Sequence, residues 1–427
     1  MRHPGFACAL LVALLLPLRL GADAPRPTIV VSPRGPVRTL AAAIAKARPG
    51  TRIVVEAGVY REPMIVVDRP VEIVGVPGAI LDGESRRQIM AISASDVTVR
   101  GLTFRNVGMS FTEDMAAVRI VKAARCRIED NRIENGFFGI YLAGVDDCTV
   151  AGNVLLATRI GESTSGNGIH LWQSTDVRIM DNVIRGHRDG IYFEFVQGAD
   201  VARNRSEENQ RYGLHFMYSH SCRYRDNVFR RNGAGVAVMY TRNVEMTGNR
   251  FEDNWGSAAY GLLLKEIADP VLRRNRFTRN TVGLLSDGST NIIAEANTFD
   301  GNGWAAKLMA NTTGGRFAGN DFVRNTFDVG TNGNTGDTQF TGNYFDGYRG
   351  YDLDRDGVGD VPHRPVTLFS VLVERNPPAM ILLRSAFAGL LEAAERVVPS
   401  LTPDALADVA PAMRPAAAHP TLRTTGR

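Results

Sequence analysis

The sequence predicts an all-β protein, a right-handed parallel β-helix, and three observations lead to this fold class. Asparagine recurs in the pattern apolar-x-x-Asn-x-(Phe/Ile/Val) with a period of roughly 22 residues, as expected of a solenoid. A glycine followed by alternating apolar residues starts a strand after most of these asparagines. The 43 glycines among 427 residues suit tight turns, because glycine adopts positive φ at little steric cost. About eleven Asn-marked rungs follow, at Asn106, Asn131, Asn153, Asn182, Asn204, Asn227, Asn249, Asn275, Asn297, Asn320 and Asn343.

Composition limits the possible functions. Apolar residues make up 44% of the chain and charged residues 22%, so the protein must bury a large core. The formal net charge of +4 is weak for this length. Charge alone therefore indicates neither nucleic-acid binding nor binding to an anionic membrane surface.

The first residues resemble a secretory signal peptide, which we assign to residues 1–24. Arg2 and His3 precede an apolar run from Phe6 to Leu18, and Ala22-Asp23-Ala24 forms a small-x-small end. Pro25 is a poor residue directly after a cleavage site, so two alternatives stay open: the cut falls elsewhere, or the segment persists as an anchor. Later apolar runs fall short of the roughly 18 residues that a membrane span needs.

Residues 25–100 are predicted to form an N-terminal cap and the first coils. An open β-helix exposes apolar ends that must be covered. The segment from Val37 to Ala47 has the pattern of a short amphipathic helix, which suits this role. Strands are expected at residues 52–56, 64–67 and 71–74.

Residues 101–365 form the predicted coil, in which each rung stacks about 4.8 Å above the last and equal repeat positions become columns. Cys126, Cys148 and Cys222 each stand five residues before the asparagine of their rung, in a column of buried apolar residues. We therefore expect buried thiols, and an odd number in an exported chain argues against a disulfide framework. The inward column after each glycine is apolar: Ile140, Ile169, Ile191, Leu214, Val236, Leu262 and Leu284.

Residues 366–414 form a predicted helical tail, and residues 415–427 are expected to be disordered. A helix is expected after Pro377 and Pro378, up to Val398, and a second begins at Thr402-Pro403-Asp404. The first helix is very apolar, so it either docks on a partner or folds back on the open end of the coil. The residues predicted to dock are Met380, Leu383, Phe387, Leu390 and Leu391.

The outward columns of the coil contain an unusual set of soft ligands. Met217 and Met239 should stack in adjacent rungs, and His215 should lie on the same face about 7 Å from Met217. Thioether and imidazole ligands suit Cu(I) better than they suit a hard cation. A partly covered aromatic and methionine surface is the alternative, and a turn position is the alternative for His187. The predicted copper ligands are His170, His187, Glu194, His215, Met217 and Met239.

An aspartate-rich loop near the end of the coil resembles a calcium loop. Asp352, Asp354 and Asp356 occupy positions 1, 3 and 5, with Gly357 at position 6 and Asp360 at position 9. The twelfth position lacks the usual glutamate. We expect a structural Ca²⁺ site, and a turn held by hydrogen bonds alone is the alternative.

A β-helix enzyme acting on polysaccharides, or a carbohydrate-binding protein, is the rival function. Such enzymes combine carboxylates with Arg or Lys in one groove. The candidates here do not form a convincing acid and base pair in one column, so the chain is not expected to be an enzyme. These candidates are Arg188, Asp189, Glu194, Lys265 and Glu266.

Several segments resemble the NosD family. They are Gly-Asn-Gly-Ile-His-Leu-Trp from Gly166, Arg-Tyr-Gly-Leu-His-Phe-Met-Tyr-Ser from Arg211, and Tyr-Asp-Leu-Asp-Arg-Asp-Gly-Val-Gly-Asp-Val-Pro at 351–362. The resemblance implies a periplasmic, non-enzymatic accessory protein for the maturation of nitrous oxide reductase. It further implies assistance in assembling the copper–sulfur cluster, with an ABC transporter permease and ATPase, a copper chaperone and the reductase as partners. The tail would dock on the permease, so that the chain meets the membrane only through its partner.

Overall fold

The computed structural model describes residues 26–110, 112–158, 161, 164–333, 337–398, 401 and 406–416. The predicted signal peptide, the predicted helix start at 402–404 and residues 417–427 lie outside this range. In the described part of the chain, no helix combines the length and the apolar character that a membrane crossing requires.

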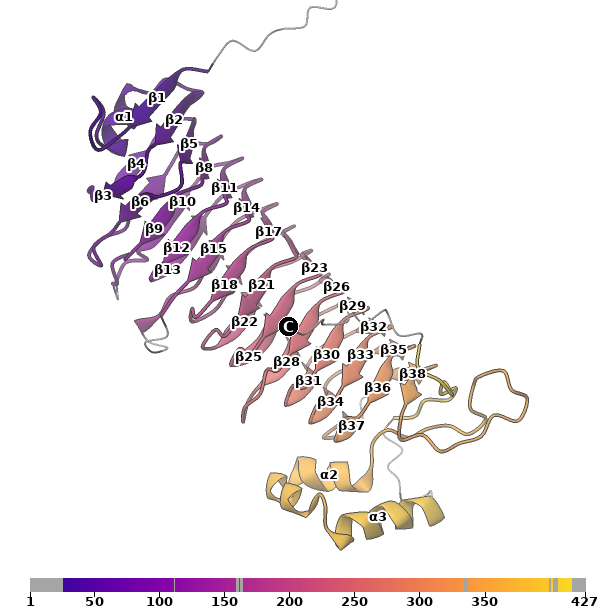
Figure 1. Cartoon of the computed structure of the whole chain (residues 1–427). Coiled ribbons are helices and arrows are strands. Elements are labelled where there is room, and N and C mark those ends of the chain that lie inside the picture. The colour runs from indigo at the N-terminus through magenta and orange to yellow at the C-terminus, as the bar shows by residue number, and fades with distance from the viewer. Residues whose placement is uncertain are drawn as a thin grey trace, which may run out of the picture.

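The chain winds into a parallel β-helix made of three long sheets (Figure 1). Sheet A has 14 strands, sheet B has 13 and sheet C has 12. Sheet A contains β1 (Thr28–Val31), β2 (Thr51–Val55), β5 (Val71–Gly75), β8 (Thr98–Arg100), β11 (Arg127–Glu129), β14 (Thr149–Ala151), β17 (Arg178–Met180), β20 (Asp200–Ala202), β23 (Arg223–Arg225), β26 (Glu245–Thr247), β29 (Val271–Arg273), β32 (Ile293–Glu295), β35 (Arg316–Ala318) and β38 (Gln339–Thr341). Sheet B contains β3 (Gly58–Tyr60), β6 (Ala79–Asp82), β9 (Thr103–Arg105), β12 (Arg132–Glu134), β15 (Val154–Leu156), β18 (Val183–Arg185), β21 (Arg205–Glu207), β24 (Val228–Arg230), β27 (Arg250–Glu252), β30 (Arg276–Thr278), β33 (Thr298–Asp300), β36 (Asp321–Val323) and β39 (Tyr344–Phe345). Sheet C contains β4 (Ile65–Val67), β7 (Met90–Ile92), β10 (Ala116–Val121), β13 (Phe138–Ala143), β16 (Ile169–Trp172), β19 (Ile191–Glu194), β22 (Tyr212–Met217), β25 (Ala234–Met239), β28 (Tyr260–Lys265), β31 (Val282–Asp287), β34 (Trp304–Leu308) and β37 (Phe327–Gly330).

The coil has about thirteen turns, two more than the asparagine count predicts. The first turns lack the marker residue, which explains the difference. Asn131 is aligned with Leu102, whose backbone N–H donates to Asn131 Oδ1 at 3.1 Å. Asn106 was assigned to the same column as Asn131, and this was wrong, because Asn106 lies four positions later at a left-handed turn.

Two ladders of buried asparagines run along the coil and satisfy the backbone at its turns. In each ladder the backbone N–H of one asparagine donates to the side-chain oxygen of the asparagine in the next rung, for example from Asn182 to Asn204 at 3.0 Å. Its side-chain Nδ2 donates to a main-chain carbonyl, as Asn182 does to Val150 O at 2.9 Å. The first ladder comprises Asn131, Asn153, Asn182, Asn204, Asn227, Asn249, Asn275, Asn297, Asn320 and Asn343, and the second comprises Asn209, Asn232, Asn254, Asn280, Asn302 and Asn325.

The core fills the space between the three sheets. Every member of the predicted inward column, from Ile140 to Leu284, is fully buried, so the strand register was predicted correctly. Phe251, Phe277 and Phe299 stack in successive rungs with ring centroids 4.7 Å apart. The three predicted buried thiols are free and fully buried, which confirms their packing role.

Helix α1 (Leu40–Lys46) covers the N-terminal end of the coil, as predicted. Thr39 caps it by accepting the N–H of Ala42 at 3.2 Å. Its buried residues Leu40 and Ile44 join the main core, so the helix closes the apolar opening.

The tail contains α2 (Leu368–Arg375), the 3-10 helix η2 (Pro377–Leu382) and α3 (Ala386–Val397). The single helix predicted after Pro377 and Pro378, up to Val398, was wrong. Two prolines at the start of η2 favour a tight turn, and the Ser385 side chain accepts the N–H of Ala388, which begins a new helix. Helix α2, before the prolines, was not anticipated.

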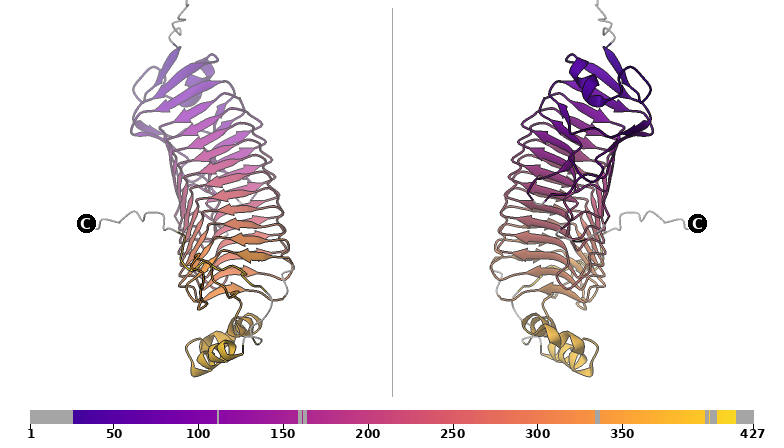
Figure 2. Two further views of the ribbon diagram at one scale, coloured as in Figure 1. Left: turned by 90° about the vertical axis from the view of Figure 1, so that its right-hand side faces the viewer. Right: turned by 90° about the vertical axis from the view of Figure 1, so that its left-hand side faces the viewer.

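The tail helices lie beyond the last coil (Figure 2), and α2 contacts the last strands of sheet C. Phe369 and Val373 of α2 form a buried cluster with Trp304 and Phe327. A different segment closes the open end of the coil. Leu406 is buried in the main core, and residues 406–412 pair with β38 and β39. This last segment therefore folds back onto the open end of the coil, whereas the helices pack beside the final strands of sheet C.

Candidate metal-binding face

The outer face of sheet C brings the predicted soft ligands together. Glu194, Met217 and Met239 are register partners on the adjacent strands β19, β22 and β25. Neighbouring strands lie about 4.8 Å apart, so the two thioether side chains are direct neighbours. His215 stands two residues before Met217 on the same outer face. We call Glu194, His215, Met217 and Met239 the Met217 face.

The members of this face differ in their access to solvent. Met217 and Met239 are half-buried at the ends of their strands. His215 is only 6% exposed and is enclosed by Tyr192 and Tyr212, whose ring centroids lie 5.1 and 4.7 Å from its own. The face therefore has an open methionine edge and a shielded imidazole.

His170 lies on the same sheet face, but its ring is occupied by neighbouring contacts. It stacks between Tyr141 and Tyr192 with centroid separations of 4.5 and 4.8 Å. Asn167 Nδ2 donates to His170 Nδ1 at 3.0 Å. Burial, together with the nearby charge of Arg188, lowers the pKa of His170 to about 3. His170 is therefore a neutral member of an aromatic stack at neutral pH.

His187 belongs to the turn column, as the alternative interpretation held. Its backbone N–H donates to Asn209 Oδ1 at 3.1 Å, which places it at the head of the second asparagine ladder. Burial lowers the pKa of its imidazole to about 4. The structure thus places His187 in the ladder and separates it from the Met217 face.

A buried carboxylate faces His215 from the neighbouring rung. Asp189 is fully buried, and its Oδ2 lies 3.8 Å from His215 Nδ1. Arg188 Nε and Arg211 Nε lie 3.8 and 4.0 Å from the same carboxylate. Among the described residues, neither Asp189 Oδ2 nor either ring nitrogen of His215 has a hydrogen-bond partner. Buried polar atoms without partners are costly, so this cluster requires a functional or structural explanation.

A stack of three aromatic residues, exposed at Phe195 and Tyr218 and half-buried at Tyr240, was not expected from the sequence. Phe195, Tyr218 and Tyr240 directly follow Glu194, Met217 and Met239, and their rings stack at 5.3 and 5.2 Å. All three have positive φ, between 50° and 56°, which is unfavourable for bulky side chains. Gly144 and Gly288 occupy the same column and also have positive φ, so this glycine pattern was the available signal.

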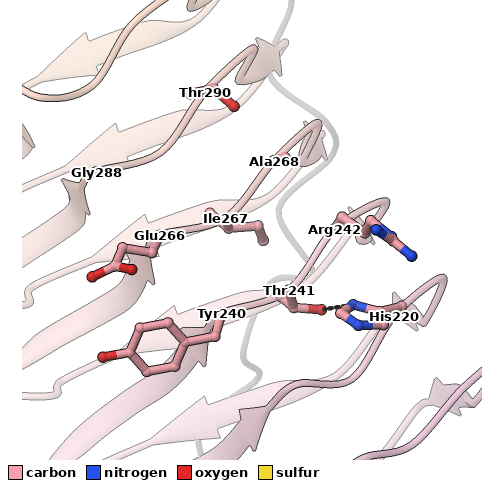
Figure 3. Close-up of a pocket in the computed structure, with 9 residues that line it drawn as sticks. All are labelled: His220, Tyr240, Thr241, Arg242, Glu266, Ile267, Ala268, Gly288 and Thr290. Carbon is pink, nitrogen blue, oxygen red and sulfur yellow. Dashed lines mark hydrogen bonds between the residues drawn. The ribbon is translucent and has the colours of Figure 1, made fainter.

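A shallow hollow of about 370 Å³ adjoins the end of this stack (Figure 3). The hollow forms because small residues replace large ones in later rungs. Gly288 occupies the column of Tyr240, and Ala268 occupies the column of Arg242. In Figure 3, Tyr240 and Glu266 point to one side of the turn and Arg242 to the other. The hollow borders the Met217 face without including its ligands.

The residues considered for an enzymatic site do not converge. Arg188 and Asp189 belong to the buried cluster beside His215. Lys265 and Glu266 stand at the end of β28, three strands away from Glu194 on β19. Glu266 therefore lies three strand spacings from Glu194, too far to pair with it.

The aspartate-rich loop brings three of its four predicted calcium ligands together. Within the described residues, ligand oxygens of Asp352, Asp354 and Asp356 lie within 4.8 Å of one another. Asp360 is not part of this group and accepts the N–H of Leu353 at 2.7 Å. Asp352 also accepts the N–H of Gly357 at 3.0 Å, so hydrogen bonds already shape the turn.

The predicted docking residues of the tail fall into two groups. Leu383 and Leu391 pack against the buried cluster around Trp304, whereas Met380, Phe387 and Leu390 are exposed. The sequence analysis missed further exposed apolar side chains, because the start of α3 at Ser385 was needed to assign its faces. These are Ile381, Val397, Val398 and Leu401.

Comparisons with solved structures support the fold. The chain superimposes on the catalytic domain of a GH87 alpha-1,3-glucanase with a TM-score of 0.55 and 11% identity, covering 73% of this chain and 67% of that chain. It matches the A-module of the Azotobacter vinelandii mannuronan C-5 epimerase AlgE6 with a TM-score of 0.50 and 14% identity, covering 71% and 87%. At this identity the likeness concerns the fold alone.

Comparisons with protein sequences identify the family. The family described as "Periplasmic copper-binding protein (NosD)" matches residues 156–350. The chain is 29% identical over 405 residues to the "Probable ABC transporter binding protein NosD" of Stutzerimonas stutzeri, covering 84% of this chain and 86% of the relative. It is 32% identical over 378 residues to the protein of the same name from Pseudomonas aeruginosa, covering 83% and 86%. The chain therefore belongs to the NosD family.

Proposed function

We propose that this protein is a periplasmic accessory protein that receives Cu(I) on the Met217 face. In this role it assists assembly of the copper–sulfur cluster of nitrous oxide reductase, together with an ABC transporter and a copper chaperone. The family description, periplasmic copper-binding protein, supports the copper part of this proposal. The name of the relatives, probable ABC transporter binding protein, supports the transporter part. The observation that carries it is the adjacency of Met217 and Met239 beside His215.

The donor set suits the transfer of a soft cation. Thioether sulfur and imidazole nitrogen are preferred by Cu(I), and a carboxylate such as Glu194 contributes little affinity for it. Neutral donors release a monovalent ion more readily than thiolates do. The buried cysteines lie inside the core, so they do not compete for the ion on the outer face.

The position of the tail supports a role in delivery. Helix α2 is anchored to sheet C by the ion pair of Lys307 Nζ with Glu374 at 2.6 Å, and Lys307 lies on β34. Met239 lies on β25, three strands earlier on the same sheet. Three strand spacings correspond to about 14 Å. A partner protein bound to the tail would therefore have the Met217 face within its reach.

Anaerobic titration of the mature protein with Cu(I), in competition with a chromophoric Cu(I) chelator, tests the metal site. Replacement of both methionines by leucine (Met217→Leu with Met239→Leu) keeps the apolar volume and removes the sulfur atoms. We expect the affinity for Cu(I) to fall by more than about tenfold, or 1.4 kcal/mol. Met180→Leu, on the outer face of sheet A, is the matched control. An unchanged affinity in the double variant would exclude this face as the site.

The maturation role requires a test in cells. In a strain that lacks the gene, nitrous oxide reductase should be produced without its copper–sulfur cluster. The wild-type gene should restore cluster absorbance, whereas the double methionine variant should not. Full restoration by the variant would show that the Met217 face is dispensable for maturation.

A polysaccharide lyase, an epimerase or a carbohydrate-binding protein is the second candidate. The aromatic surface of sheet C favours it, since sugars stack on aromatic rings. However, both faces of the His170 ring are covered by Tyr141 and Tyr192. Incubation with uronate polymers, followed by detection of unsaturated or epimerised products, tests this function. Product formation would replace the copper proposal.

A further inference from the structure

The two histidines of the sheet C face, His170 and His215, have different partners at Nδ1. Asn167 presents its amide nitrogen to His170, whereas Asp189 presents a carboxylate oxygen to His215. A neutral imidazole carries one proton, on either Nδ1 or Nε2, and its neighbours decide which. The partner at Nδ1 therefore determines whether Nε2 keeps the lone pair that a metal ligand needs.

The partner of His170 disfavours metal binding. The nitrogen of a side-chain amide can only donate hydrogen bonds, so the 3.0 Å contact from Asn167 Nδ2 makes His170 Nδ1 the acceptor. The proton of the neutral ring then lies on Nε2. In this tautomer neither nitrogen has a free lone pair for a metal.

The partner of His215 has the opposite effect. A carboxylate oxygen can only accept, so Asp189 Oδ2 at 3.8 Å favours the proton on His215 Nδ1. The separation exceeds a hydrogen bond, and in the described structure neither atom has another hydrogen-bond partner. Carboxylates of this kind commonly orient metal-binding histidines, and such contacts can shorten when the ligand binds.

The surroundings hold Asp189 in place for this role. Its Oδ1 accepts the backbone N–H of Tyr212 at 3.3 Å, and Tyr212 begins the strand that carries His215. Arg188 Nε lies 3.8 Å from the same Oδ2 that faces His215, and Arg211 Nε lies 4.0 Å from Oδ1, so the two guanidinium groups compensate the buried charge. One carboxylate oxygen thus accepts from the backbone, while the other lies 3.8 Å from both His215 Nδ1 and Arg188 Nε.

We infer that Asp189 is a positioning residue that keeps the proton of His215 on Nδ1, so that His215 Nε2, and not His170, supplies the imidazole ligand of the Met217 face. The metal part of this inference rests on the proposed function. The tautomer part does not, because it concerns the protein without metal.

Long-range ¹H–¹⁵N NMR of the metal-free, histidine-labelled mature protein reads the tautomers directly. His170→Asn and His215→Asn variants assign the two rings. We expect His215 to be protonated at Nδ1 and His170 at Nε2. An Nε2-protonated His215 would overturn the inference, whatever the outcome of copper titrations.

Substitutions of the two Nδ1 partners provide matched tests. Asp189→Asn should weaken Cu(I) binding about 10- to 100-fold, the usual effect of losing such an orienting group. Asn167→Ala should leave the affinity unchanged, and Asn167→Asp should move the His170 proton to Nδ1. Thermal unfolding of each variant shows whether it folds. A folded Asp189→Asn variant with wild-type affinity would contradict the inference, whereas absence of Cu(I) binding in the wild type would refute the proposed function and leave the NMR result valid.

Discussion

Asp408 Oδ2 accepts two hydrogen bonds from Asn343, one from its backbone N–H at 2.9 Å and one from its side-chain Nδ2 at 2.7 Å. In every earlier rung of the first ladder, the corresponding acceptor is the side-chain oxygen of the next asparagine. A residue 65 positions further along the chain therefore supplies the acceptor that the last rung lacks. The fully buried Asp408 terminates the ladder in the way that a capping residue terminates a helix.

Removal of this terminator should destabilise the protein. In Asp408→Ala, two buried donors of Asn343 lose their acceptor, at a cost of about 1–3 kcal/mol each. Asp408→Asn keeps one side-chain oxygen for Asn343 but loses the second, which accepts the N–H of Ala410 at 3.0 Å, so it should lose less stability than Asp408→Ala. Urea unfolding followed by circular dichroism measures both effects. Equal losses in the two variants would show that the acceptor for Asn343 is not the stabilising feature of Asp408.

Stability should fall on mild acidification because the protein buries neutral histidines. Burial lowers the pKa of His187 and of His363 to about 4, from the usual 6.5. Between pH 6.5 and 4 the unfolded chain binds protons that the folded chain does not, so the free energy of unfolding decreases as the pH falls. Each group accounts for about 2 kcal/mol at pH 5, which lies 1.5 units below the usual pKa.

His187→Asn tests this dependence, because asparagine is the residue that the ladder holds in the following rungs. The melting temperature of the variant should drop less between pH 7.5 and pH 5 than that of the wild type. The less buried His220 serves as a control through His220→Asn, which should change the pH dependence less. Parallel curves for the wild type and His187→Asn would contradict the assignment.

The exposed apolar side chains of the tail are predicted to bind the transporter permease. Ile381 and Leu390 are 89% and 67% exposed, so their replacement by serine should change the unfolding free energy by less than about 0.5 kcal/mol. Co-purification with the permease should be lost. Val66→Ser, an exposed apolar residue on β4 at the other end of the coil, should leave co-purification intact. Retained binding by the double tail variant would exclude this surface.

The Asp352 loop is predicted to bind Ca²⁺ with a structural effect. At a calcium concentration 100-fold above Kd, binding should stabilise the protein by about 2.7 kcal/mol. Asp354→Asn keeps the hydrogen-bond acceptor of the turn and removes one charge, so it should reduce this gain. Calorimetry with Ca²⁺, with Mg²⁺ and with EDTA compares the three states. Identical melting in all of them would leave the loop as a hydrogen-bonded turn.

The sequence was sufficient to predict the strand register of the coil. It was not sufficient to predict which of the outward histidines has surroundings that suit a metal ligand. Strand alternation places Met217, Met239 and His215 outward regardless of tertiary detail, since the period of a strand is fixed. The same reasoning could not separate His170 from His215, because their difference lies in the groups that approach from neighbouring turns. Asn106 shows a related limit, because asparagine occurs at two different positions of the repeat and the sequence alone did not distinguish them.

The aromatic stack and the tail show a second limit of the sequence. The strain at Phe195, Tyr218 and Tyr240 depends on a backbone conformation that aromatic residues rarely adopt, so composition gave no reason to expect it. The faces of α3 depended on where the helix begins, which Ser385 decides by a capping bond. Boundary residues of this kind determine which apolar side chains remain exposed.

The coil between Met239 and the anchoring residue Lys307 consists of turns with a constant spacing. Because each turn adds about 4.8 Å, the distance between the Met217 face and the tail helices can change only by whole turns. Loss or gain of one repeat would shift the tail helices by one turn relative to the Met217 face while leaving the ladders intact. The number of repeats therefore sets this spacing, and single substitutions on the surface cannot alter it.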